Sequence, residues 1–329
     1  MQVEAKAPGK VIITGEHFVV ENEPGVAAAV SLYAKVNARV IDDNIIRIRA
    51  VNFNKGEIIK KDDLYNERIK VNAIFKPFIK ILLDVCKEYG ELPSMDISIF
   101  SDIPAKSGLG SSAATATAFA AAILRILNAE LDLDKVSQLA YEAEKITHGK
   151  PSGIDNTVST YGGVIVFRKT EGFIKLEDIN YESLIFILAD SGSREETKIL
   201  VEKVRKLRQK YEEVFVPFYH AAGHLSIELA KALREGNILA VGELMNISHG
   251  MLYSLGLSTE KIEELVFAAR KAGALGAKIT GAGGGGMILA LVTPDTIDSV
   301  QKELKRAGAT WVKAVRVEEK GVLVNVDKH

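Results

Sequence analysis

The sequence predicts a two-part α+β fold, with a β-rich first half and a helix-rich second half. Short β-branched runs fill the first part of the chain, and amphipathic helical patterns fill most of the part after residue 195. A length of 329 residues suggests about two domains. With 47% hydrophobic and 26% charged residues, the composition excludes disorder, collagen and a coiled coil.

β-branched runs bounded by Gly, Pro, Asn and Asp predict four strands at the amino end: Val3–Ala7, Val11–Thr14, Val36–Val40 and Ile45–Val51. Apolar residues at helical spacing predict one helix over Val71–Tyr89, with a kink at Pro77. Met95–Phe100 alternates as a strand. After it, Ala113–Leu127 is almost entirely apolar and predicts a buried helix.

The middle of the chain continues this α+β pattern. Asp132–Ile146 predicts a helix, Gly149–Asn156 is rich in turn residues, and Val164–Phe167 and Leu184–Ala189 predict strands.

The second half is dominated by helical patterns. The predicted helices are Glu195–Tyr211, Phe218–Leu233, Asn237–Ser248, Thr259–Ala272 and Thr296–Arg306, and the predicted strands are Met287–Val292 and Val312–Val317. We therefore expect two domains, residues 1–180 and 181–329.

Charge and cysteine content narrow the function classes. A net charge of −1 gives no overall field for nucleic acid or a membrane surface. The single Cys86 cannot form an intramolecular disulfide, which favours a reducing, cytoplasmic location. The most apolar stretch, Ala113–Leu127, is too short to span a bilayer.

A glycine-rich loop precedes the apolar helix and has the features of a phosphate site. It reads Ser107-Gly-Leu-Gly-Ser-Ser-Ala-Ala114, so the candidate ATP-binding residues are Ser107, Gly108, Leu109, Gly110, Ser111 and Ser112. Unpaired N–H groups and the helix dipole attract phosphate at a helix start. The residues alone also fit a tight turn with a serine cap. The loop is neither a Walker A sequence nor GxGxxG.

A second glycine-rich loop, Thr280-Gly-Ala-Gly-Gly-Gly-Gly286, lies between apolar elements. Consecutive glycines are costly to order, which favours close backbone approach over a flexible loop. We expect Gly281 and Gly283 to bind ATP, with the two loops clamping one polyphosphate between the domains.

Three segments together resemble the signature motifs of the GHMP small-molecule kinases. They are Ala7-Pro-Gly-Lys-Val-Ile-Ile-Thr-Gly-Glu-His17, the loop Ser107–Ala114 and Lys278-Ile-Thr-Gly-Ala-Gly-Gly-Gly-Gly286, in family order over nearly the whole chain. The resemblance implies a two-domain GHMP kinase fold, with a ribosomal protein S5 domain 2-like amino half and a ferredoxin-like carboxyl half. It also implies ATP as donor and Mg²⁺ as cofactor.

Within the superfamily, Gly149-Lys-Pro-Ser-Gly-Ile-Asp-Asn-Thr-Val-Ser-Thr-Tyr-Gly-Gly163 resembles the mevalonate kinase family, as does Asn246–Ser258. The implied reaction phosphorylates the 5-hydroxyl of mevalonate, in isoprenoid biosynthesis. Glu21–Gly25 and Lys106 differ from the residues that are usual in the family, so the resemblance defines the substrate pocket in less detail. Alternatives are a GHMP kinase for phosphomevalonate or another mevalonate-type acid, and a catalytically silent metabolite sensor.

The resemblance assigns roles that agree with the residues' chemistry. Asp155 would accept or orient the proton of the attacking hydroxyl, beside Lys10. Glu144 and Ser112 would hold Mg²⁺ on the phosphates. Without the resemblance, Asp155 reads as a helix cap and Glu144 as a solvated carboxylate.

Glu16, His17 and Thr197 match residues near the acceptor pocket, where they would bind the mevalonate hydroxyl and carboxylate. The family also suggests a homodimer. His220 and His224 have metal-ligand spacing but no evident third ligand, which favours an ordinary helical placement.

Overall fold

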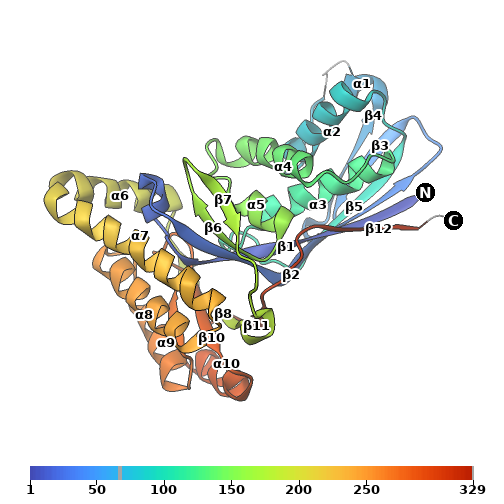
Figure 1. Cartoon of the computed structure of the whole chain (residues 1–329). Coiled ribbons are helices and arrows are strands. Elements are labelled where there is room, and N and C mark those ends of the chain that lie inside the picture. Colours follow the sequence, from blue (N-terminus) through green and yellow to red (C-terminus); the bar gives the residue numbers. More distant parts are fainter. Residues whose placement is uncertain (66–68, 328–329) are drawn as a thin grey trace.

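The computed structural model describes residues 1–65 and 69–327. Two sheets, each covered by helices, make up this part of the chain, and α6–α10 lie together at one end of the molecule (Figure 1). The predicted α+β class is confirmed.

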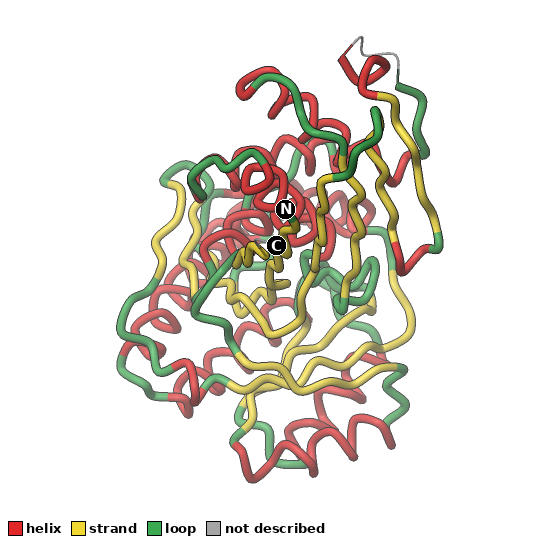
Figure 2. Tube along the Cα trace, turned by 90° about the vertical axis from the view of Figure 1, so that its right-hand side faces the viewer, coloured by secondary structure: helices red, strands yellow, loops and turns green. Residues whose placement is uncertain are grey.

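The larger sheet has eight strands within the described residues, six of them in the order β12-β1-β2-β5-β3-β4. Their bounds are β1 Gln2–Thr14, β2 Gly25–Val40, β3 Ile45–Ala50, β4 Lys55–Lys60, β5 Met95–Ser101 and β12 Leu323–Asp327. A short ladder of β6 (Val164–Arg168) and β7 (Gly172–Lys175) branches from β2. Strand β12 pairs with β1, so strands from the two ends of the chain are neighbours (Figure 2).

Helices from the first half cover one face of this sheet (Figure 1). They are α1 Lys61–Tyr65, α2 Lys76–Tyr89, α3 Ser111–Ile126, α4 Leu133–His148 and α5 Ile154–Tyr161. Single 3₁₀ turns occupy η1 Phe18–Glu21, η2 Val51–Phe53, η3 Ala73–Phe75, η4 Tyr181–Ser183 and η5 Pro294–Thr296.

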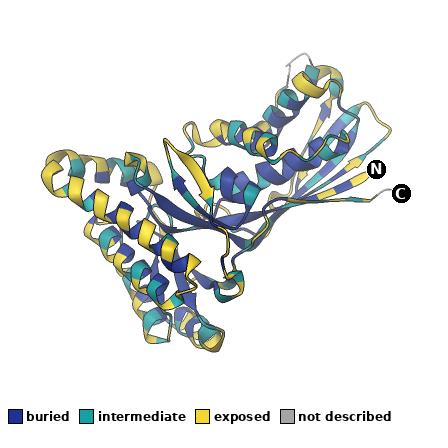
Figure 3. Cartoon of the chain, viewed as in Figure 1, coloured by how far each residue is buried: buried dark blue, intermediate teal, exposed yellow. Residues whose placement is uncertain are grey.

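The smaller sheet has the order β11-β8-β10-β9. Its strands are β8 Ile185–Arg194, β9 Gly276–Ile279, β10 Gly285–Val292 and β11 Trp311–Arg316. The accompanying helices are α6 Thr197–Lys210, α7 Glu212–Arg234, α8 Ile238–Ser254, α9 Glu260–Lys271 and α10 Ile297–Arg306. Exposed residues gather on the outer sides of α6 and α7 (Figure 3).

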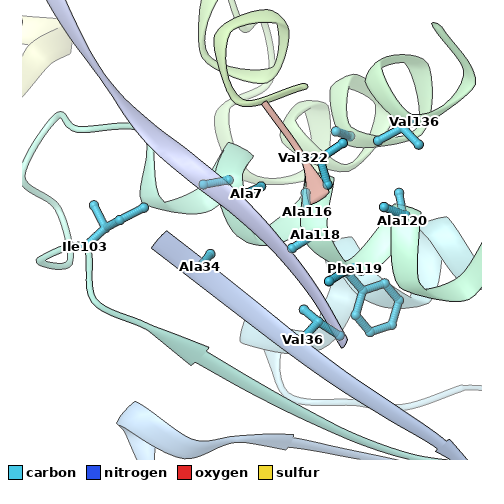
Figure 4. Packing of buried hydrophobic residues seen from close by; sticks show 14 of the residues in the cluster. Ala7, Ala34, Val36, Ile103, Ala116, Ala118, Phe119, Ala120, Val136 and Val322 are labelled. Atoms are coloured by element: carbon cyan, nitrogen blue, oxygen red, sulfur yellow. The ribbon is translucent and has the colours of Figure 1, made fainter. Parts of the chain in front are cut away.

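Helix α3 is the centre of the larger core. Alanines at 116, 118 and 120 are buried, and their small side chains let the helix pack closely on the elements that surround it, β1 and β2 among them (Figure 4). Phe119 fills the space beside Val36 on β2 (Figure 4). This packing fixes the axis of α3, and with it the direction in which its amino terminus points.

The hydrophobic core runs across both sheets. Leu188 on β8 and Met245 on α8 belong to the same buried cluster as Val3 and Val36 of the larger sheet. The bridge between Val30 and Val317 also joins the two parts. A domain division at residue 180 stays a prediction.

Several element predictions need correction. The two strands predicted at Val3–Ala7 and Val11–Thr14 are one strand, β1, with a register shift at Pro8 and Gly9. Strand β2 begins at Gly25, well before the predicted Val36, and its first part was missed because it is rich in alanine, a residue that is depleted in strands. Pro77 starts α2 rather than kinking it.

The turn-rich segment after Gly149 contains the start of a helix, α5. Strands β4, β7, β9 and β12 were not predicted. In the described part of the chain, no helix is both long and apolar enough to cross a membrane.

Helix α8 and strand β9 approach closely at two glycines. A Cβ on Gly242 would lie 2.6 Å from the Leu275 carbonyl oxygen, and a Cβ on Gly276 would lie 2.3 Å from the Gly242 oxygen. By contrast, a Cβ on Gly250, also in α8, would meet nothing within 4 Å. The contact between α8 and β9 therefore depends on the missing side chain at Gly242.

We expect Gly242→Ala to lower the free energy of unfolding by about 1–3 kcal/mol, because the added methyl group overpacks this contact. The matched change Gly250→Ala should raise it by about 0.8–1.0 kcal/mol through helix propensity. Urea denaturation followed by circular dichroism measures both. Equal stability of the two variants would contradict a tight contact at Gly242.

Candidate active site

Strand β1 lies between the two glycine-rich loops. The backbone N–H of Lys10 donates to the carbonyl of Leu109 in the first loop, at 2.9 Å. Two residues further along, the Ile12 N–H donates to Thr280 Oγ1, and that hydroxyl donates back to the Ile12 carbonyl, both at 3.1 Å. One strand therefore holds both loops within three residues.

The first loop leads directly into α3. Gly108 and Gly110 have φ angles of 77° and 74°, in the left-handed region that favours glycine. Leu109 is buried, and the Ser107 hydroxyl accepts a hydrogen bond from its N–H. The N-terminal N–H groups of α3 are thereby presented beside the loop, an arrangement suited to phosphate oxygens.

Lys10 and Asp155 form an ion pair beside this loop, with Nζ 3.2 Å from Oδ1. The lysine side chain is 5% exposed and the aspartate 36% exposed, so the carboxylate faces the accessible side. Asp155 stands in the first turn of α5, after Gly153 in the left-handed region. A Cβ on Gly110 would lie 3.0 Å from Lys10 Cγ, so glycine there gives the lysine room.

Ser112 and Glu144 also meet, although they come from different helices. The Ser112 hydroxyl donates to Glu144 Oε1, and His148 Nε2 lies 3.7 Å from Glu144 Oε2. Burial raises the pKa of Glu144, and the negative charge of Asp155 raises it further. The Ser112 hydrogen bond and the charges of His148 and Lys10 lower it. A buried carboxylate beside a hydroxyl is a donor set that fits Mg²⁺ when phosphate oxygens and water complete the shell.

Glu16 and His17 follow β1 and contact the third motif. The Lys278 ammonium donates to Glu16 Oε1, and the His17 Nε2–H donates to the Ala282 carbonyl at 2.8 Å. Burial lowers the pKa of His17, opposed by the Ala282 carbonyl and Glu16. Burial likewise lowers the pKa of Lys278, opposed by Glu16. Glu16 and His17 therefore lie in one turn that is held against the third motif.

Thr197 is exposed at the start of α6, and the described residues give its side chain no hydrogen bond to Glu16 or His17. In the third motif, a Cβ on Gly281 would meet nothing within 4 Å, whereas one on Gly283 would meet the Leu257 carbonyl at 2.6 Å. Gly281 thus borders open space and Gly283 packs against protein. ATP binding by either glycine stays a prediction.

Sequence reasoning missed a cavity of about 470 Å³ next to the first loop. Asn52, Phe53, Ile74 and Pro77 line it, together with Ser111 and Ser112. The Asn52 amide pairs with the backbone of Ser101 through two hydrogen bonds, which fixes that wall. No sequence motif marks these residues. A wider hollow of about 660 Å³ along α6 contains none of the site residues.

Arg194 was also missed. It pairs with Asp190 and donates to the Lys106 carbonyl at 2.6 Å, which connects β8 to the residue before the first loop. The sequence Ser193-Arg-Glu-Glu offers no signal for this contact.

Comparison with known proteins identifies the family. The model of the GHMP kinases N terminal domain matches residues 76–163, and that of the GHMP kinases C terminal domain matches residues 229–310. A mevalonate kinase from Pyrococcus furiosus is 39% identical over 325 residues, covering 94% of this chain and 95% of that protein. The chain belongs to the GHMP kinases, in the mevalonate kinase branch.

Other GHMP kinases agree in sequence and in structure. A mevalonate kinase from Arabidopsis thaliana is 30% identical, covering 94% of this chain and 96% of that protein. The crystal structure of the Methanococcus jannaschii mevalonate kinase has a TM-score of 0.85 at 27% identity, covering 97% and 98% of the two chains. That of the L. major mevalonate kinase in complex with R-mevalonate has a TM-score of 0.81 at 28% identity, covering 95% of each. The expected GHMP kinase fold is confirmed.

Proposed function

We propose that this chain phosphorylates the 5-hydroxyl of (R)-mevalonate with ATP, giving 5-phosphomevalonate and ADP. The observation that carries the chemistry is the Lys10–Asp155 ion pair, which lies beside the phosphate-type loop that opens α3. The acceptor is supported by the mevalonate kinases that match nearly the full chain. A cytoplasmic location and a homodimer stay predictions.

The proposed transfer is direct and in line. The mevalonate oxygen bonds to the γ-phosphorus as the bond between that phosphorus and the β,γ-bridging oxygen breaks, and ADP leaves. Asp155 accepts or orients the proton of the hydroxyl. Lys10 pairs with Asp155 and offsets negative charge on the transferred group.

Ser112 and Glu144 are the residues that would hold Mg²⁺. The ion would neutralise charge on the β- and γ-phosphates. The first loop and the N–H groups of α3 would bind the phosphates directly. The cavity lined by Asn52 and Phe53 opens beside them and has the size and apolar character to accept the nucleotide base.

The acceptor is tested by measuring ADP release with ATP and Mg²⁺ across mevalonate, phosphomevalonate, homoserine and galactose. We expect turnover with mevalonate alone, because the relatives that match nearly the full chain are mevalonate kinases. Phosphorus NMR of the product should place the phosphate on the 5-oxygen. Turnover with phosphomevalonate and not mevalonate would overturn the assignment.

Asp155→Asn should lower kcat by about 10²–10⁴-fold, because the amide cannot take up the hydroxyl proton. ATP affinity should stay within about twofold, since the substituted group is assigned to the acceptor. Steady-state kinetics and a nucleotide-binding titration check this. Asp298→Asn, exposed on α10, is the matched control. Near-normal turnover in Asp155→Asn would contradict the role.

Removal of divalent metal with a chelator should abolish turnover, and added Mg²⁺ should restore it. Glu144→Gln should raise the Mg²⁺ concentration needed for half-maximal rate by about tenfold or more, because an anionic ligand is lost. Glu142→Gln on the same helix removes only a surface ion pair with Lys145, and its Mg²⁺ dependence should match the unsubstituted enzyme. Identical dependence in both variants would exclude Glu144 as a ligand.

A further inference from the structure

Lys278 is a buried charge that the proposed reaction does not use. Its side chain on β9 is fully buried, and the side chain of its partner Glu16 is 1% exposed. The ammonium donates to Glu16 Oε1 and to the carbonyl of Ile279. In the described part of the chain, no other ion pair buries both side chains so fully. Because desolvation offsets most of the attraction in such a pair, stability alone is a weak reason to keep it.

The pair joins the first and third motifs, and two other contacts run alongside it. Thr280 exchanges two hydrogen bonds with the backbone of Ile12, and His17 donates to the Ala282 carbonyl. Lys278, Thr280 and Ala282, three alternate residues of the third motif, thus bond to the segment that ends in the Glu16–His17 turn. Lys278 supplies the charged contact of the three.

The turn itself has two features of a prepared binding site. His17 has a φ angle of 64°, a left-handed conformation that is uncommon and strained outside glycine. Glu16 Oε2 is buried and has no hydrogen-bond partner. Buried carboxylate oxygens normally accept a hydrogen bond, so a ligand could supply the donor that this oxygen lacks.

We propose that Lys278 is a positioning residue for the acceptor substrate. By binding Oε1, the ammonium fixes the rotamer of the Glu16 side chain, so that Oε2 stays free to accept a hydrogen bond from a mevalonate hydroxyl. Lys278 does not touch the substrate and acts only through Glu16. The inference rests on the proposed function, which assigns the Glu16–His17 turn to the acceptor.

The alternative is a purely structural role, in which Lys278 only holds the two motifs together. Loss of a structural contact would lower stability and weaken the binding of both substrates alike. A positioning role predicts a selective loss, confined to the acceptor. The Michaelis constants for mevalonate and for ATP therefore separate the two.

Lys278→Met should raise the KM for mevalonate at least about tenfold and leave the KM for ATP within about twofold. Lys278→Arg, which keeps the charge, should recover part of the mevalonate affinity. Lys175→Met is the control, because the Lys175 ammonium likewise makes two hydrogen bonds within the protein, to the carbonyls of Tyr161 and Glu319, away from the turn. It should alter thermal stability without changing the KM for mevalonate.

A double variant covers the case in which Lys278→Met does not fold. Lys278→Met with Glu16→Gln removes both buried charges and keeps similar side-chain volumes. If Lys278 acts through Glu16, the double variant should bind mevalonate no more weakly than Glu16→Gln alone. An additional loss in the double variant, or an unchanged KM in folded Lys278→Met, would overturn the proposal.

The unsubstituted enzyme, assayed in parallel, separates this inference from the proposed function. If it does not turn over mevalonate, the function fails before any variant is compared. If it does, and Lys278→Met loses affinity for ATP as much as for mevalonate, only the positioning role fails.

Discussion

The site depends on how firmly strand β1 is held. Its backbone pairs with β2 on one side and with β12 on the other. Beyond the β12 ladder, which ends at Lys6, the backbone of Lys10 and Ile12 bonds to Leu109 and Thr280 of the two loops. Its side chains and the turn after it supply Lys10, Glu16 and His17. Because the strand is held along both edges, the backbone positions of these three residues are fixed, which limits where their flexible side chains can reach.

The electrostatics of the site differ on the two sides of this strand. On the side of α3 and α5, Lys10 is buried while Asp155 stays partly exposed, and Glu144 is close enough to respond to both charges. On the side of the third motif, Lys278 and Glu16 are both sealed from water. The partly exposed Lys10–Asp155 pair suits groups that take part in proton and phosphate transfer. The buried Lys278–Glu16 pair suits groups that keep the same geometry during the reaction.

The sequence predicted the parts that have local patterns or a family motif. Helix α3 was evident because its apolar run is long. Lys10, Ser112 and Asp155 became candidates because each lies in a recognisable motif, and Glu144 because it matches a family residue eleven positions before Asp155. Strand β1 appeared as two because Pro8 and Gly9 interrupt its pattern. Strand β12 was missed because Asn325 and Asp327 break up its short apolar run. The contacts of Asn52 and Lys278 could not be predicted, because their partners lie far away in sequence and a polar residue in a strand or turn is normally expected to be exposed.

The pairing of β1 with β12 has a consequence for biosynthesis. Gln2 to Lys6 emerge from the ribosome early, yet their partners, Leu323 to Asp327, are made after nearly all of the remaining chain. Helices α2 to α4 can collapse on the larger sheet during translation, but one edge of β1 stays uncovered until the end. Translation that stops before β12 would therefore leave a chain that holds every motif of the kinase and still exposes a strand edge open to wrong pairing.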